Sequence, residues 1–198
     1  MERHFPFGAS YSPLIFAESE WERDLANMRK AGMNLVRIGD VHGSWDRIEP
    51  RQGEFQWDVL SRFYSTARQF GVQVLLCTGT SSPPLWLARC YPDISILSSR
   101  AERYPLGASY HWACIHHSGY RLAAENYLQK IVKFANTQPN HFGWQISNEI
   151  GFPFMPAREQ NDLGIYCYCN FCQDEFRAWM RKKYNSLEAL TEAWSWST

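Results

Sequence analysis

Strand patterns and helix patterns alternate along this chain from its first residues, and this alternation constrains the fold more than any other feature. Three amphipathic stretches predict helices, at 19–32, 57–70 and 120–135; the first opens on an S-x-x-E capping box. Helix-then-strand units of this spacing give a parallel sheet with right-handed crossovers. The apolar runs that predict the four strands are 7–11, 34–39, 72–78 and 142–147.

Two architectures fit this βαβαβαβ order: an open doubly wound sheet and a (β/α)₈ barrel. No G-x-G-x-x-G sequence follows the first strand, which disfavours a dinucleotide-binding sheet. A full barrel needs about 250 residues and eight strands. The chain has 198 residues and four strong strand patterns. If the fold is a TIM barrel, we therefore expect this chain to hold about its first half.

Charge and hydropathy exclude some classes of partner. The chain has 20 Lys+Arg and 20 Asp+Glu, and this balance disfavours general binding to nucleic acid, which needs a basic surplus. No window approaches the roughly 18 apolar residues of a membrane span, and no signal-peptide core is present at the start. We therefore predict a soluble, cytoplasmic protein. Aromatic residues make up 16% of the chain, which suits either a ligand cleft or a large core.

The last predicted strand ends in polar residues that suit carbohydrate chemistry. The sequence WQISNEIG places Asn148 and Glu149 at the carboxyl end of the sheet, where ligands bind in both architectures. A carboxyl group shielded from water there can act as a general acid, and glycoside hydrolysis needs such an acid and a second carboxylate. The alternative is that Glu149 caps a turn or pairs with an arginine.

Six cysteines raise the question of a metal. Three of them form the cluster Cys167-x-Cys169-x-x-Cys172, and thiolates at this spacing can wrap a tetrahedral Zn²⁺. Cys114 is the best-placed fourth ligand because it lies in a polar loop. Cys77 lies inside an apolar strand and is better read as a small buried hydrophobe. Other candidates stay open: Cys90, His111, His116 and His117.

Three further features have both a functional and a plain structural interpretation. The prolines Pro83 and Pro84 predict an extended turn that places Trp86 either near the cleft or under a loop. Trp45 has the same two interpretations. The basic run 181–183 follows an apolar stripe and predicts the solvated end of an amphipathic helix.

Together these segments resemble family 42 of the glycoside hydrolases, chiefly β-galactosidases. The resemblance runs in order over nearly the whole chain and implies a (β/α)₈ barrel. On this basis residues 1–198 are the N-terminal portion of the catalytic domain, with a zinc-binding loop around 167–172. The matching pieces are Tyr11-Ser12-Pro13, 24–32, 35–39, Trp45 to Pro50, Gly53-Glu54-Phe55, 78–87, 144–151, the cysteine cluster and 176–179.

The resemblance also implies roles for single residues. Glu149 matches the acid/base of a retaining glycosidase, and Asn148 matches its sugar-binding neighbour. The four thiolates match a structural zinc site. The implied reaction is hydrolysis of terminal β-D-galactose from a β-galactoside or related oligosaccharide (EC 3.2.1.23), with a homo-oligomer of the full-length protein as an open possibility. The implied zinc ligands are Cys114, Cys167, Cys169 and Cys172.

Two departures from the family pattern leave alternatives open. The family places its nucleophilic glutamate near the seventh strand, beyond Thr198, so we expect the 198-residue chain alone to be inactive. The family also has an arginine shortly before the first zinc cysteine, whereas 108–113 contains none. The alternatives are therefore a retaining glycosidase for another sugar, or a non-catalytic zinc-bound fragment.

Overall fold

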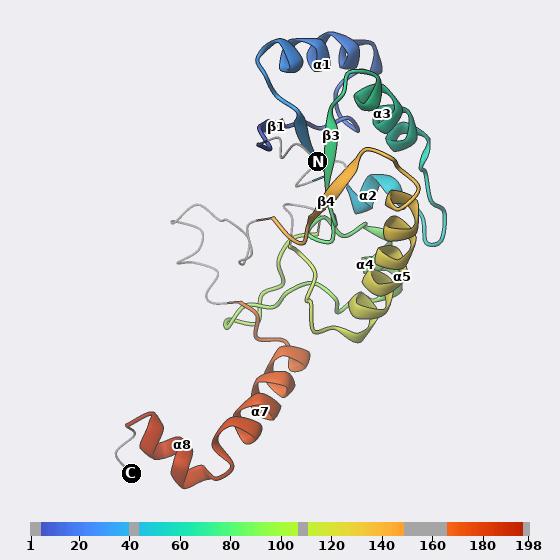
Figure 1. The fold of residues 1–198 in the computed structure, drawn as a ribbon. Helices are drawn as coiled ribbons and strands as arrows, with labels where there is room; N and C mark the ends of the chain where they lie inside the picture. Colours follow the sequence, from blue (N-terminus) through green and yellow to red (C-terminus); the bar gives the residue numbers. More distant parts are fainter. Residues whose placement is uncertain (1–4, 40–43, 107–110, 149–165, 196–198) are drawn as a thin grey trace.

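Parallel strands form one sheet in the order β1-β2-β3-β4, so each strand pairs with the next one along the chain (Figure 1). The structure is a computed structural model that describes residues 5–39, 44–106, 111–148 and 166–195. This strand order is the one that the first half of a (β/α)₈ barrel requires. The strands are β1 (Gly8–Ser10), β2 (Leu35–Ile38), β3 (Gln73–Cys77) and β4 (His141–Gln145).

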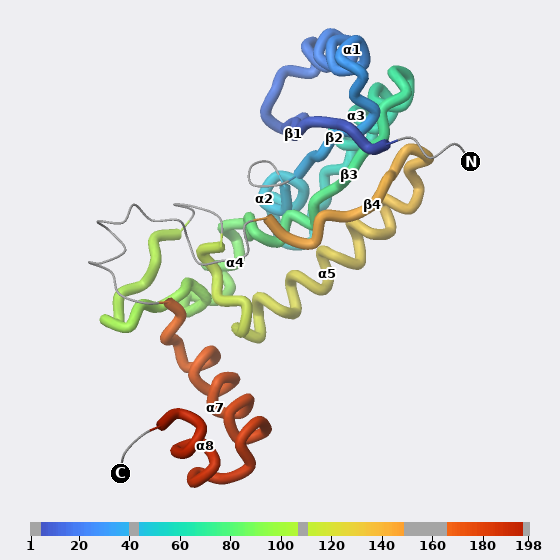
Figure 2. Tube along the Cα trace, turned by 60° about the vertical axis from the view of Figure 1, so that its left-hand side comes forward, coloured from blue at the N-terminus to red at the C-terminus, as the bar shows by residue number. Residues whose placement is uncertain are grey.

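One long helix connects each pair of successive strands, and these connecting helices are α1, α3 and α5. They cover one face of the sheet, with α5 running alongside β4 (Figures 1 and 2). The short helices α2 and α4 lie in the loops after β2 and β3. The helices are η1 (a 3₁₀ turn, Glu18–Glu20), α1 (Trp21–Lys30), α2 (Trp45–Ile48), α3 (Asp58–Gln69), α4 (Trp86–Cys90), α5 (Ser118–Ala135), α7 (Asn170–Tyr184) and α8 (Leu187–Ala193).

The two faces of the sheet differ in burial, as the two-residue period of a strand requires. Val36 and Val74, on the face that the helices cover, have no exposed surface. On the opposite face Leu35, Arg37 and Leu75 are only half-buried. Burying each branched side chain stabilises the fold by about 1.5–3 kcal/mol, so the helix-covered face supplies much of the core.

Aromatic rings join the helices to the sheet and account for much of the aromatic excess. The Phe63 ring stacks on Tyr11 at 5.6 Å and meets Trp21 edge-on at 5.2 Å. A second pair, Trp45 and Tyr127, stacks at 4.9 Å. Such pairs stabilise by about 0.5–1.5 kcal/mol beyond their buried area. The core interpretation of the aromatic content therefore holds for these rings.

The capping box predicted at the first helix is wrong. Ser19 lies inside the 3₁₀ turn η1, and α1 then begins at Trp21 with Glu20 at its N-cap and no side-chain cap. A serine caps a helix from an extended backbone, so a serine within a helical turn cannot do so. The helix itself forms as predicted, because Trp21 and Leu25 lie on one buried face.

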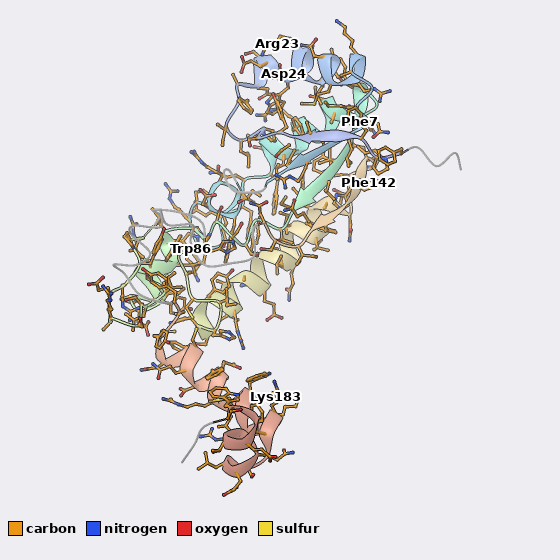
Figure 3. All side chains as sticks on the ribbon, turned by 90° about the vertical axis from the view of Figure 1, so that its left-hand side faces the viewer. Phe7, Arg23, Asp24, Trp86, Phe142 and Lys183 are labelled. Carbon is orange, nitrogen blue, oxygen red and sulfur yellow. The ribbon has the colours of Figure 1, made fainter. Side chains whose placement is uncertain are left out.

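The two ambiguous tryptophans both contact the segment around Glu49. Trp45 is fully buried, and its Nε1 donates to the Glu49 carboxylate at 2.7 Å. Trp86 opens α4 and donates from Nε1 to the backbone oxygen of Glu49 at 3.0 Å. Figure 3 shows Trp86 in the loop region beyond the carboxyl ends of the strands. Both indole groups therefore fix the Glu49 loop.

The helices α7 and α8 project away from the sheet (Figures 1 and 2). The amphipathic helix predicted before the basic run is present as α7, but no residue of α7 is buried. Its stripe residues Phe176 and Trp179 are 49% and 48% exposed, and Lys183 lies 4.7 Å from the Trp179 ring centre. Among the described residues, no helix is long and apolar enough to cross a membrane.

Candidate functional site

Polar side chains from β2 and β4 meet at the carboxyl end of the sheet, around Asn148. The Gln145 amide donates from Nε2 to Asn148 Oδ1 at 3.2 Å. The Arg37 guanidinium donates from Nη1 to Gln145 Oε1 at 3.1 Å and to Asn148 Oδ1 at 3.4 Å. Because Oδ1 accepts from both side chains, the amide Nδ2 is the group that Asn148 can present to a ligand.

This network extends to two other strands. Arg37 Nη2 lies 3.2 Å from the Ser10 hydroxyl on β1, and the Cys77 thiol on β3 donates to Gln145 Oε1 at 3.1 Å. Cys77 is buried, as predicted, but its thiol also has a polar partner. The site therefore rests on all strands of the described sheet. Glu149, the predicted acid/base, lies outside the described residues.

Arg37 and Gln145 were not predicted as site residues. The sequence did carry a signal for them: Arg37 is a charged residue inside the otherwise apolar strand LVRI, and Gln145 is a polar residue at the end of the strand HFGWQ. A buried or half-buried charge in a strand needs a polar partner, so it indicates a network at that face. The network lies at the carboxyl ends of the strands, which is where a (β/α)₈ barrel binds its ligand.

The sulfur atoms of Cys114, Cys167, Cys169 and Cys172 form one compact cluster, in which they all lie within 4.8 Å of one another. Cys114 Sγ lies 3.4 Å from both Cys169 Sγ and Cys172 Sγ. Four sulfurs around a tetrahedral zinc at 2.3 Å would be about 3.8 Å apart. The spacing fits such a metal, and the four thiols are free cysteines. The cluster can therefore bind a metal ion.

Two elements deliver the cysteines. Cys169 is the N-cap of α7 and Cys172 lies in the first turn of that helix. Cys114 lies in the loop before α5, and its backbone N–H donates to the Ile94 oxygen at 2.8 Å. Cys167 precedes α7, and its sulfur accepts from the Leu97 N–H at 3.4 Å. The metal would therefore join α7 to the loops that follow β3.

The thiols of the cluster differ in pKa. A hydrogen bond from Cys114, with further backbone donors, lowers the pKa of Cys167 to about 5, although burial opposes this. The pKa of Cys114 is raised, first by its hydrogen bond to Cys167 and then by burial. Burial raises the pKa of Cys172 to about 12. The thiolate is the form that binds a metal, and among these thiols the hydrogen bonds favour it at Cys167.

The competing ligands have other partners. His117 Nδ1 accepts from the Gly119 N–H at 3.0 Å and so caps α5, while His117 Nε2 lies 3.2 Å from Asp93. His116 Nδ1 lies 2.7 Å from an Arg121 nitrogen. Cys90 is exposed and lies outside the cluster. The choice of Cys114 as fourth cysteine therefore agrees with the geometry.

A cavity of about 450 Å³ lies between the cysteine cluster and the end of β4. Ser147, two residues beyond β4, lines this cavity, and so do His111, Cys114, Cys167 and Cys172. The candidate ligand site and the candidate metal site are therefore neighbours.

Consecutive βα units whose described strands pair in the order β1-β2-β3-β4, with no reversal of strand order, define the chain as part of a TIM-barrel protein. Comparison with protein families sharpens this class. The model of the Glyco_hydro_42 family, described as beta-galactosidase, matches residues 10–198. The chain therefore belongs to family 42 of the glycoside hydrolases.

Individual relatives agree with this assignment. The chain is similar to beta-galactosidase LacZ of Heyndrickxia coagulans, with 30% identity over 96% of this chain and 27% of the relative. Among solved structures, it resembles the beta-galactosidase of Halorubrum lacusprofundi with a TM-score of 0.82, 30% identity and coverage of 96% and 27%. The Marinomonas ef1 beta-galactosidase gives a TM-score of 0.80 at 28% identity, with the same coverage. The chain thus spans about a quarter of the length of these relatives.

Proposed function

We propose that this chain is the N-terminal portion, residues 1–198, of the catalytic domain of a retaining β-galactosidase, which removes terminal non-reducing β-D-galactose from a β-galactoside. The observation that carries this proposal is the Asn148 amide, held by Gln145 and Arg37 at the carboxyl end of β4. An amide fixed in this way suits a sugar hydroxyl oxygen, because its Nδ2 can donate. Membership of family 42 supports the same substrate class.

In the proposed mechanism, Glu149 is the general acid and base. Its carboxylic acid protonates the glycosidic oxygen as the bond to the anomeric carbon breaks, and its carboxylate later takes a proton from the attacking water. A second carboxylate attacks the anomeric carbon and forms the covalent glycosyl intermediate, which the water then hydrolyses. We propose that this second carboxylate comes from sequence outside the 198 residues, and that these residues alone do not turn over substrate.

We further propose that the cysteine cluster holds a structural Zn²⁺. Cys114, Cys167, Cys169 and Cys172 would supply four thiolates, and a closed four-sulfur site leaves no open position for water. The sulfur spacing supports a tetrahedral ion of this size. The zinc loop around 167–172 would then stabilise the fold and take no part in proton transfer.

The acid/base role can be tested by comparing leaving groups. In the protein extended to the length of its relatives, Glu149→Gln should lower kcat/KM for lactose by about 10²–10⁴-fold. The loss should be much smaller for a dinitrophenyl galactoside in the glycosylation step, because that leaving group needs no proton. Glu125→Gln, at an exposed position on α5, is the matched control. An equal loss for both substrates would count against the role. Turnover by the 198-residue chain itself would count against the proposal that the second carboxylate lies outside these residues.

A different sugar is the second candidate, because the stretch 108–113 lacks the arginine that the family has before the first zinc cysteine. A panel of nitrophenyl glycosides separates the two. Preference for galactoside over fucoside, arabinoside and glucoside supports β-galactosidase activity, whereas preference for another sugar supports the second candidate.

A further inference from the structure

A histidine joins the cysteine-cluster loop to the end of β4. His111 Nε2 lies 3.0 Å from the backbone oxygen of Asn148. A carbonyl oxygen can only accept, so Nε2 carries the proton and donates it. His111 stands three residues before Cys114 in the same loop. The His111 side chain therefore connects the loop that carries Cys114, a candidate metal ligand, to Asn148, the proposed sugar-binding residue.

The backbone of His111 is held in place on its own side. Its N–H donates to the Ser81 oxygen at 2.6 Å, and its φ is +60°, in the left-handed region. That conformation costs a non-glycine residue of the order of 1 kcal/mol, so the surrounding contacts must impose it. The next residue, Trp112, is 1% exposed and donates from Nε1 to the Pro83 oxygen at 3.1 Å.

The segment 111–114 continues directly into the metal cluster. Cys114 is buried, and it contacts Cys169 and Cys172, which belong to the start of α7. A bound ion would hold each of these sulfurs at the same metal–sulfur distance. It would therefore fix the position of Cys114, the last residue of the segment. The 450 Å³ cavity is lined by His111 and Cys114, so the segment forms part of the cavity wall.

Asn148 is thereby held from two directions. Gln145 and Arg37, on the strands, hold its side chain. His111, in the segment 111–114, holds its backbone oxygen. We propose that His111 is a positioning residue through which metal occupancy of the cysteine cluster sets the backbone of Asn148. The proposal rests on the proposed function for the role of Asn148, and its test involves no hydrolysis.

The sequence offers a selective probe of this hydrogen bond, because Asn148-Glu149 is the only Asn-Glu pair in the chain. Labelling asparagine carbonyls with ¹³C and glutamate nitrogens with ¹⁵N gives a single carbonyl–amide correlation in the NMR spectrum, and it reports the Asn148 carbonyl. The spectrum is recorded for zinc-loaded protein, after chelation, and after zinc is restored. We expect the carbonyl resonance to move upfield on chelation, as the hydrogen bond from His111 is lost, and to return with zinc.

Three variants test whether His111 carries the effect. In His111→Ala the resonance should lie at the zinc-free position and no longer respond to zinc, while the protein still binds one zinc. His111→Gln keeps an N–H donor and should restore part of the zinc response. His116→Ala is the matched control, because His116 lines the same cavity and contacts Arg121 instead.

Several results would overturn the proposal. An Asn148 resonance that ignores zinc in the unsubstituted protein is one, and it needs no variant. A second is a zinc response that survives in His111→Ala. A third is loss of zinc binding by His111→Ala, since a residue outside the cluster should leave the ligands intact. A failed hydrolysis assay would leave these outcomes unaffected and would bear only on the proposed function.

Discussion

The helix α3 and the helix α7 show two ways in which this chain holds its elements together. Four residues of α3 are buried, Leu60, Phe63, Tyr64 and Ala67, and they pack toward the sheet. None of the residues of α7 is buried, although that helix is longer. The contacts that join α7 to the rest of the described chain come largely from its first turn, where the cysteines lie. Apolar burial thus holds α3, whereas α7 is joined mainly at its start, by the half-buried Phe171, whose ring centre lies 4.4 Å from that of His117, and by the thiols of the cluster.

This comparison predicts that the stability of the βα core and the zinc affinity of the cysteine cluster can be lost independently. The largest effect is expected on removal of one thiolate. Cys169→Ser should weaken zinc binding by more than about 100-fold, because a hydroxyl is a poor ligand for this soft site. The unfolding midpoint of the βα core should change little. A competition titration with a chelating dye measures the affinity. Cys90→Ser, at an exposed cysteine outside the cluster, should bind zinc normally; equal loss in both variants would contradict the assignment.

A core truncation should show the reverse pattern. Phe63→Ala removes a fully buried ring that contacts Tyr11 and Trp21, and it should lower the free energy of unfolding by about 3–5 kcal/mol. Urea denaturation followed by tryptophan fluorescence measures this change. Phe176→Ala, at a half-exposed position on α7, should cost less than about 0.5 kcal/mol. A similar cost at both positions would erase the difference between the regions.

The smallest expected effect concerns acid. Burial lowers the pKa of His141 on β4, and the Tyr64 hydroxyl lies 3.1 Å from its Nδ1. The unfolded chain therefore protonates His141 at a higher pH than the folded protein does. The free energy of unfolding should fall as the pH drops below the ordinary histidine pKa of about 6.5. In His141→Gln this part of the pH dependence should disappear from urea denaturation curves. If the free energy of unfolding changed with pH between 7 and 5 in His141→Gln as steeply as in the unsubstituted protein, His141 would not contribute.

The periodic parts of the fold could be predicted from the sequence. The strands and the connecting helices lie within a few residues of the predicted ranges, because burial on one face leaves a two-residue or a three-to-four-residue period. The failed capping box at Ser19 shows the limit: a cap depends on backbone angles that the residue type does not determine. The short helices α2 and α4 were also missed, since four or five residues carry no period.

The candidate site was predictable only in part. Asn148 follows from its place at a strand end, three of the cysteines follow from their spacing, and Cys114 follows from its place in a polar loop. The roles of Arg37 and His111 depend on contacts across 111 and 37 positions of sequence, which no local pattern encodes. The amino-acid sequence shows which residues are unusual for their position, and only the fold shows which of them are in contact.

The position of two cysteines at the start of α7 has an electrostatic consequence. Zinc with four thiolates carries a net charge of −2, and the N-terminus of a helix carries about +0.5 from its aligned peptide dipoles. Cys169 at the N-cap and Cys172 in the first turn place that negative complex at the positive end of the helix. The metal complex would serve as an anionic cap for α7, so zinc binding and helix formation would favour each other.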